Sequence, residues 1–187
     1  MSDPKPAASS SVKPAKAPVT KPAVVVPKYM AVARSYLGTK EAPGSVNNPK
    51  VVEMFKLAAH PEIKQDSVPW CAAFVAACLK QGGAPNEVVP SLRLWAAAYG
   101  QLGTKLAQPA YGCVGVKTRN GGGHVGFVVA ANKDFVWLLG GNQGDAVSIA
   151  KFSRSSFTAF RLPTGVDAKS LPKLPSDAKG ALNPSQA

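Results

Sequence analysis

The sequence predicts an α+β fold, with helices first and an antiparallel β-sheet second. One observation is a change of period near residue 110, where apolar residues at helical spacing give way to short β-branched and aromatic runs. A second is the turn residues that separate these runs, at 120–123, 132–134 and 144–145. Helical segments followed by a meander of strands are typical of an α+β domain.

Four helices are expected in the first half of the chain. Gly38 is a natural C-cap for the first, and Asn48 followed by Pro49 is typical of an N-cap and a first helical position for the second. The third is apolar almost all the way round, which predicts a helix buried on most sides. The expected helices span residues 29–37, 50–58, 70–79 and 91–99.

Five short strands are expected in the second half, each bounded by turn residues. The turn at 132–134 joins two of them into a hairpin, so residues just after 139 should return beside residue 124. The expected strands span residues 111–116, 124–131, 135–139, 146–152 and 158–162.

The composition places the folded core in residues 29–162. All seven Phe, three Trp and four Tyr residues lie between Tyr29 and Phe160. Residues 1–28 and 163–187 are rich in proline and contain no aromatic residue or cysteine, which predicts flexible tails. No apolar run approaches the ~18 residues that a membrane-spanning helix needs. The N-terminus lacks a basic segment followed by an apolar one, so synthesis in the cytoplasm without a secretory signal is expected.

The charge is strongly basic, with 22 Lys and Arg residues against 10 Asp and Glu and a net charge of +12. Such a balance predicts an acidic partner, either nucleic acid, an anionic membrane or an anionic polymer such as a bacterial wall. Basic and aromatic residues do not alternate as in nucleic-acid-binding modules, and many of the lysines lie in the tails. We therefore expect no nucleic-acid partner.

Cys71 is the candidate nucleophile. It opens the expected helix over 70–79, and a thiol at a helix N-terminus feels the positive end of the helix dipole, which favours the reactive thiolate. Three cysteines leave at least one thiol unpaired, which excludes a disulfide-stapled scaffold. Cys78 on the same helix and Cys113 in an expected strand fit the ordinary interpretation of a free cysteine as a small buried hydrophobe.

A nucleophilic cysteine needs a base, and the chain has two histidines. His60 lies in a polar loop, as a solvated surface residue would, whereas His124 follows a run of glycines and begins an expected strand. The imidazole of His124 needs an orienting group, and the expected hairpin returns Asn142 beside it, with Asp145 as the alternative. Asn142 fits equally well as a plain turn former.

These motifs, in this order, resemble the papain-like cysteine amidases of the CHAP and NlpC types, which hydrolyse peptidoglycan. The resemblance covers residues 29–162 and points to a branch found in phage endolysins and bacterial wall-lytic effectors. Many CHAP members have Glu two positions before the Asn, whereas this chain has Gly140, so Asn142 would act alone as the third member. The stretches that carry the resemblance are 68–75, 122–127 and 139–145, with further likeness at 36–41 and 47–49.

The resemblance implies a papain-like fold, with the N-terminal helices packed on the C-terminal sheet, and acyl transfer from a peptidoglycan amide bond. Cys71 would attack the carbonyl, and His124 would act as base and then as acid. Asn142 would orient the imidazole, and Trp70 would line the substrate groove unless it only packs in the core. The cleaved bond would be the one between muramic acid and L-alanine or one within the stem peptide.

Two other functions stay open: a papain-like protease or deamidase toxin that acts on protein, and a basic non-enzymatic module that binds wall or nucleic acid. We expect no cofactor and no metal, because Cys71 and Cys78 lack a usual zinc spacing. The family analogy leaves calcium open, although no acidic loop in the sequence suits it. The expected protein is a monomer whose partners are peptidoglycan and, for an effector, a cognate immunity protein. It would act in the periplasm or cell wall, after phage-driven lysis or delivery by a secretion system.

Overall fold

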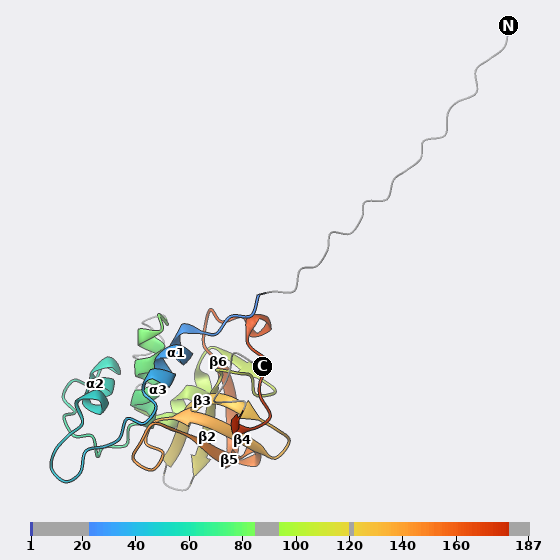
Figure 1. Ribbon diagram of the computed structural model, residues 1–187. Coiled ribbons are helices and arrows are strands. Elements are labelled where there is room, and N and C mark those ends of the chain that lie inside the picture. Colours follow the sequence, from blue (N-terminus) through green and yellow to red (C-terminus); the bar gives the residue numbers. More distant parts are fainter. Residues whose placement is uncertain (2–22, 85–93, 120–121, 180–187) are drawn as a thin grey trace.

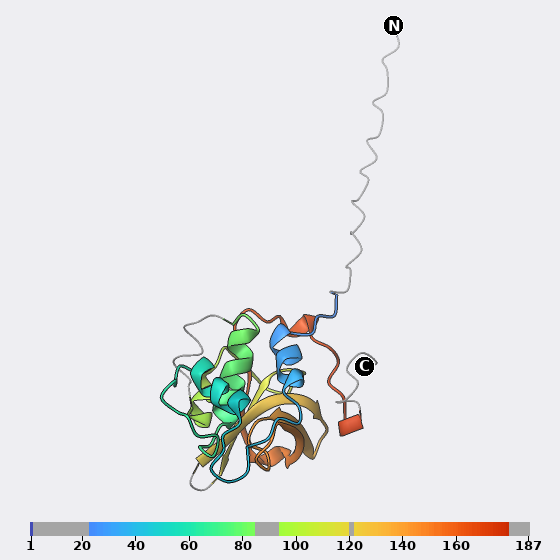
Figure 2. The same cartoon turned by 60° about the vertical axis from the view of Figure 1, so that its left-hand side comes forward.

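Helices and a curved antiparallel sheet form two layers. The computed structural model describes residues 1, 23–84, 94–119 and 122–179. Helices α1 (Lys28–Ser35) and α3 (Cys71–Gln81) cover one face of the sheet, and α2 (Pro49–Leu57) packs on α3 (Figures 1 and 2). This architecture confirms the α+β fold class. Within the described ranges, no helix has both the length and the apolar character that crossing a bilayer requires.

Six strands build the sheet, and every neighbouring pair is antiparallel. Their order across the sheet is β1-β6-β2-β3-β4-β5. The expected hairpin over 124–139 is present, with Phe127 opposite Leu139. The strands are β1 (Thr104–Leu106), β2 (Val114–Arg119), β3 (Gly122–Ala131), β4 (Phe135–Gly140), β5 (Ser148–Ser153) and β6 (Phe157–Leu162).

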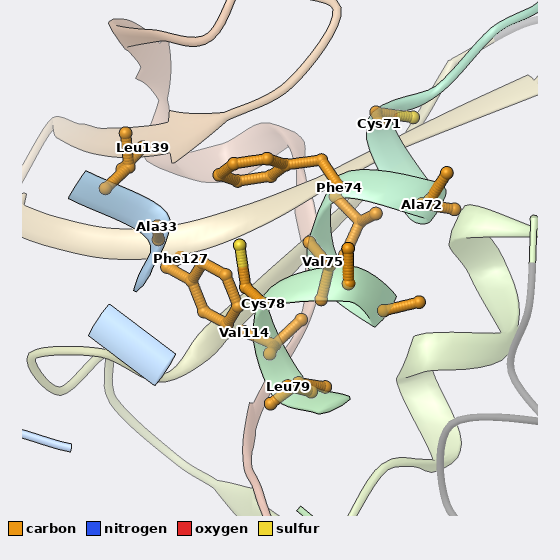
Figure 3. Close-up of a cluster of buried hydrophobic side chains, with 14 of the residues drawn as sticks. Ala33, Cys71, Ala72, Phe74, Val75, Cys78, Leu79, Val114, Phe127 and Leu139 are labelled. Carbon is orange, nitrogen blue, oxygen red and sulfur yellow. The ribbon is translucent and has the colours of Figure 1, made fainter. Parts of the chain in front are cut away.

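The buried helix α3 holds the helical layer against the sheet. Its residues 71–79 are all buried, as the apolar run predicts. The ring of Phe74 meets Phe127 of β3 edge-on, with the ring centroids 6.1 Å apart, and Tyr29 of α1 stacks on the same Phe127 ring at 5.2 Å. Figure 3 shows this cluster, with Phe127 reaching from β3 toward the body of α3. Helix α3 is therefore fixed over the middle of the sheet.

A second apolar cluster lies on the other face of the sheet. Its buried members are Cys113, Val128, Val136, Leu138 and Leu162, and the later Leu171 and Leu174 pack against it. The backbone N–H of Ala131 donates to the carbonyl of Pro175 (2.8 Å), and that of Val25 donates to the carbonyl of Ser170 (2.7 Å). Residues 25 and 163–175, which the composition assigned to tails, thus lie against the domain. Residues 2–22 and 180–187 of those tails lie outside the described residues.

Some expected elements differ in type or position. Residues 91–93 of the expected fourth helix lie outside the described residues, and the part that follows is a 3₁₀ helix, η1 (Ala96–Gln101). Strand β2 begins at Val114 rather than at residue 111, because Gly112 has φ +75° and the Cys113 N–H closes a turn onto Ala110. Strand β1 and two further 3₁₀ turns, η2 (Arg154–Ser156) and η3 (Ala168–Ser170), were not expected.

Candidate active site

The three cysteines fall into two kinds of environment. Cys78 and Cys113 are fully buried, whereas Cys71 keeps 9% of its surface exposed. Burial raises the pKa of the Cys78 thiol well above its ordinary value and that of Cys113 to about 12, so both stay protonated near neutral pH. Figure 3 shows Cys78 inside the apolar cluster, while Cys71 lies at the end of α3, away from Phe127. Of the three thiols, only that of Cys71 belongs to a residue with exposed surface.

The N-terminus of α3 presents donors beside Cys71. Trp70 precedes the helix and makes no side-chain capping hydrogen bond, so the first backbone N–H groups of α3 lack that partner. Such a terminus attracts negative charge because its N–H dipoles point outward. Tyr99 of η1 donates its hydroxyl to the carbonyl of Ala72 (3.0 Å), and its pKa is raised by burial and by the nearby thiols of Cys71 and Cys78. This contact fixes η1 against the first turn of α3.

His124 lies in a pocket of about 260 Å³. Its Nε2 is 3.0 Å from Oε1 of Gln143, and its ring centroid is 5.6 Å from that of Phe152 on β5. Lys117 lies directly opposite His124 on β2 and places its ammonium 4.2 Å from the Phe152 ring centroid, a cation–π contact. The pocket is lined by Lys117, His124, Asn142, Gln143, Gly144, Ala150 and Phe152. His60, by contrast, lies in a loop, with its Nδ1 2.7 Å from Glu62.

The structure brings Asn142 to the same pocket as His124, as the hairpin predicted. The amide in contact with the imidazole, however, belongs to Gln143. Asn142 has φ +55°, a left-handed conformation that Asn adopts more easily than most residues, so it also serves as a turn former. Asp145, the alternative orienting group, is not among the residues that line the pocket. The catalytic roles of Cys71, His124 and Asn142 stay predictions.

Two close contacts connect the Cys71 end of α3 to the His124 pocket. Gly141, next to Asn142, lies against α3 so closely that a Cβ there would be 2.6 Å from Trp70 Cζ3 and from Phe74 Cβ. Gly123, next to His124, lies beside η1, and a Cβ on Gly123 would be 3.3 Å from the Cβ of Ala96. Cys71 itself is not among the pocket-lining residues. Gly141, the neighbour of Asn142, thus packs on the residue before Cys71. Gly123, the neighbour of His124, packs on η1, which Tyr99 joins to the first turn of α3.

Trp70 is buried, with 0% of its surface exposed. Its indole N–H donates to Glu41 Oε1 (2.7 Å), and its ring packs on Gly141. Of the two roles considered for Trp70, groove lining and core packing, the second matches these contacts, because a fully covered ring has no surface to offer a substrate. Trp70 instead positions the loop after β4.

Backbone hydrogen bonds from an early segment hold the loop that carries Gln143. The N–H of Gly38 donates to Val147 O (3.0 Å), that of Val147 to Thr39 O (2.8 Å) and that of Glu41 to Asp145 O (2.9 Å). We call residues 38–41 the backbone clamp. Lys40 of the clamp and Ala146 form an isolated antiparallel bridge, just before β5 begins.

Two pocket residues were not anticipated from the sequence. Gln143 directly follows Asn142 and lies in the stretch 139–145 that carries the family resemblance, but the sequence alone gives it no role. Lys117 could have been found from the hairpin of β2 and β3, since it pairs with His124 in that register. Among the described residues, no three His, Cys, Asp or Glu side chains cluster closely enough to hold a metal ion.

Comparison with known proteins gives one family match. Residues 63–142 match the family model of the CHAP domain, a segment that runs from just before α3 to the end of the β3–β4 hairpin. This match confirms the CHAP resemblance and includes Cys71, His124 and Asn142, with Gln143 one residue beyond it. CHAP domains are typically cysteine- and histidine-dependent amidases or peptidases, and the family indicates a peptidoglycan hydrolase or amidase type of activity. No curated protein and no solved structure matches the chain.

Proposed function

We propose that this chain hydrolyses an amide bond of peptidoglycan, with Cys71 as nucleophile and His124 as general base. The observation that carries the proposal is the CHAP match over 63–142, which includes both residues. The environments of the thiols support the same choice, because burial keeps Cys78 and Cys113 protonated while Cys71 reaches the surface. The packing of Gly141 on Trp70 and of Gly123 on Ala96 connects the two ends of the site.

The reaction is acyl transfer in two halves. The imidazole of His124 takes the thiol proton of Cys71, and the sulfur attacks the amide carbonyl carbon. The imidazolium then protonates the leaving amine as the C–N bond breaks, which leaves a thioester on Cys71. Water, deprotonated by the same imidazole, attacks the thioester and releases a carboxylate and the free thiol.

The negative oxygen of each tetrahedral intermediate needs donors in place before the reaction. The first turn of α3 supplies them, since the first N–H groups of a helix have no carbonyl partner within it. The backbone N–H of Cys71 is the donor nearest to the sulfur and is the one that we assign to the oxyanion. Tyr99 supports this turn through its bond to Ala72.

The proposed setting is degradation of a bacterial cell wall, in phage lysis or in killing between bacteria, with the enzyme acting in the periplasm or the wall. The net charge of +12 suits an anionic wall polymer. An effector would have a cognate immunity protein encoded beside it, whereas a phage enzyme would have a neighbouring holin. The genes next to this one distinguish the two settings.

Digestion of purified sacculi tests the proposal. The full-length protein is expected to release soluble muropeptides, and Cys71→Ala and His124→Ala to release none, while Cys78→Ala, which removes a buried thiol outside the site, keeps the activity. Mass spectrometry then assigns the bond: glycan strands freed of peptide indicate an amidase, and shortened stem peptides indicate an endopeptidase. Clearing of sacculi by Cys71→Ala would overturn the mechanism, and cleavage of denatured protein alone would favour the protease alternative.

A further inference from the structure

We propose that Gln143 is the positioning residue of His124, and that it holds the imidazole with a proton on Nε2 and the lone pair on Nδ1. The inference rests on the proposed function for its catalytic meaning, but the state of the ring follows from hydrogen bonding alone. Asn142, which the sequence favoured for this role, shapes the turn that delivers Gln143.

The orientation of the Gln143 amide is fixed by its other contacts. Its Nε2 lies 2.6 Å from the carbonyl oxygen of Ser148 and 3.3 Å from that of Leu138. A carbonyl oxygen only accepts, so the group that faces these two oxygens must be the NH₂ end. Turning the amide over would place two oxygens 2.6 Å apart, and the usual ambiguity between amide N and O is absent here. Oε1 therefore faces His124.

The amide oxygen in turn fixes the state of the ring. Oε1 of Gln143 lies 3.0 Å from Nε2 of His124 and only accepts, so Nε2 must carry a proton. The neutral ring that meets this condition has its lone pair on Nδ1, and the imidazolium meets it as well. Nδ1 is then the atom that takes the Cys71 proton and returns it to the leaving amine, while the bond at Nε2 stays intact throughout.

The backbone around Gln143 leaves room for its side-chain amide because residue 140 is glycine. A Cβ at Gly140 would be 2.9 Å from Gln143 Oε1 and 3.0 Å from its Cδ, so any larger residue at 140 would displace the amide from His124. The N–H of Gln143 donates to Ala146 O (2.9 Å), and Ser148 Oγ donates to its carbonyl (3.3 Å). Both ends of the residue are thus held, and the side chain cannot turn away without losing several hydrogen bonds.

Ring ¹⁵N spectra of the full-length protein test the assignment, with His60 as the one other histidine. The Cys71→Ala background prevents proton transfer from the thiol, and pH 8.5 leaves a free imidazole neutral. We expect His124 to be in the Nε2–H form, with that proton protected from exchange with water by its bond to Gln143 Oε1. Gln143→Met should speed this exchange and mix the two tautomers, whereas the matched Asn142→Gly variant, which tolerates φ +55°, should leave both readings unchanged. An Nδ1–H ring in the presence of Gln143, or a change with Asn142→Gly alone, would overturn the inference.

If Gln143→Met does not fold, a second variant tests the same contact. Gly140→Ala leaves Gln143 in place but puts a Cβ 2.9 Å from its Oε1, so the amide should be displaced from Nε2 of His124. We expect this variant to mix the two tautomers as Gln143→Met does, with Lys117, the charged group that lines the pocket from β2, unchanged. An unchanged Nε2–H ring in Gly140→Ala would contradict the contact.

Activity separates this inference from the proposed function. Gln143→Met should lower kcat/KM on sacculi roughly 10²-fold, the range that general acid–base groups contribute, and alter the pH profile of kcat. If the spectra behave as expected but no variant cleaves sacculi, the proposed function fails and the positioning role stands. If sacculi are cleaved and the spectra do not depend on Gln143, the reverse holds.

Discussion

Gly141 should be among the positions least tolerant of an added methyl group. It is buried in the loop after β4, where a Cβ would lie 2.6 Å from both Trp70 Cζ3 and Phe74 Cβ. Both partners are fully buried, and both are attached to the start of α3. The φ of Gly141 is outside the left-handed region, so backbone strain adds nothing and crowding alone sets the cost.

Overpacking a dense core typically costs about 1–3 kcal/mol. The added Cβ would meet both the Trp70 ring and the Cβ of Phe74, which places the cost of Gly141→Ala at about 3 kcal/mol. For a chain of this size, such a loss lowers Tm by roughly 6–12 °C. Urea denaturation followed by circular dichroism measures the free energy of unfolding, and thermal melts give Tm. Gly100→Ala is the matched control, because nothing lies within 4 Å of its Cβ position, and its effect should stay within about 0.5 kcal/mol. A Gly141→Ala protein as stable as the wild type would refute the close packing of this loop on α3.

Three further predictions concern buried polar and thiol groups. Asp66, 3% exposed, accepts from the N–H groups of Ala42 (2.7 Å) and Asn48 (2.8 Å), so Asp66→Ala should cost about 3 kcal/mol in urea denaturation. Asp66→Asn keeps an acceptor and should cost less than half of that; equal costs would contradict the hydrogen bonds. The raised thiol pKa values make the free energy of unfolding fall as the pH rises from about 9 toward 12, because the unfolded chain releases these protons first. Cys113→Ala should make that fall shallower in denaturation curves taken across this range, and an unchanged slope would count against the assignment. In native protein at neutral pH, a thiol reagent such as DTNB should label Cys71 first, and Cys71→Ala should react only after unfolding; equal labelling of all three thiols would contradict the burial described above.

The sequence predicted the helical layer well where a local signal determines the structure. The side chain of Asn48 accepts from the Lys50 N–H (2.9 Å) and Pro49 is the first residue of α2, as an N-cap pair should be. The apolar run of α3 is buried throughout because the helix lies between α1, α2 and the sheet. Strand β1 was missed because its three residues, Thr104–Leu106, carry no alternating pattern and depend on pairing with β6.

The site was predicted as far as strand geometry allows. Turn residues at 132–134 indicate the hairpin, and pairing then places Leu139, near the end of β4, opposite Phe127, three residues after His124. Which of two adjacent amides faces His124 is decided by one backbone angle. Asn142 adopts φ +55°, and the amide of the next residue, Gln143, faces the ring. The sequence indicates Asn142 as a turn former, but it does not show which of the two adjacent amides the turn brings to the ring.

The backbone clamp has a consequence for how this protein tolerates mutation. Its hydrogen bonds join main-chain atoms of residues 38–41 to those of 145–147, so they are blind to side-chain identity. A scan that replaces the side chains of Lys40 or Thr39 would leave these bonds intact and would misjudge the segment as dispensable. Proline at Glu41 or Val147 removes a donor and releases the loop that carries Gln143. A changed side chain at Lys40 is therefore compatible with an unchanged site. Glu41 and Gly38 are restricted further, because Glu41 accepts from the Trp70 indole and Gly38 has φ +81°.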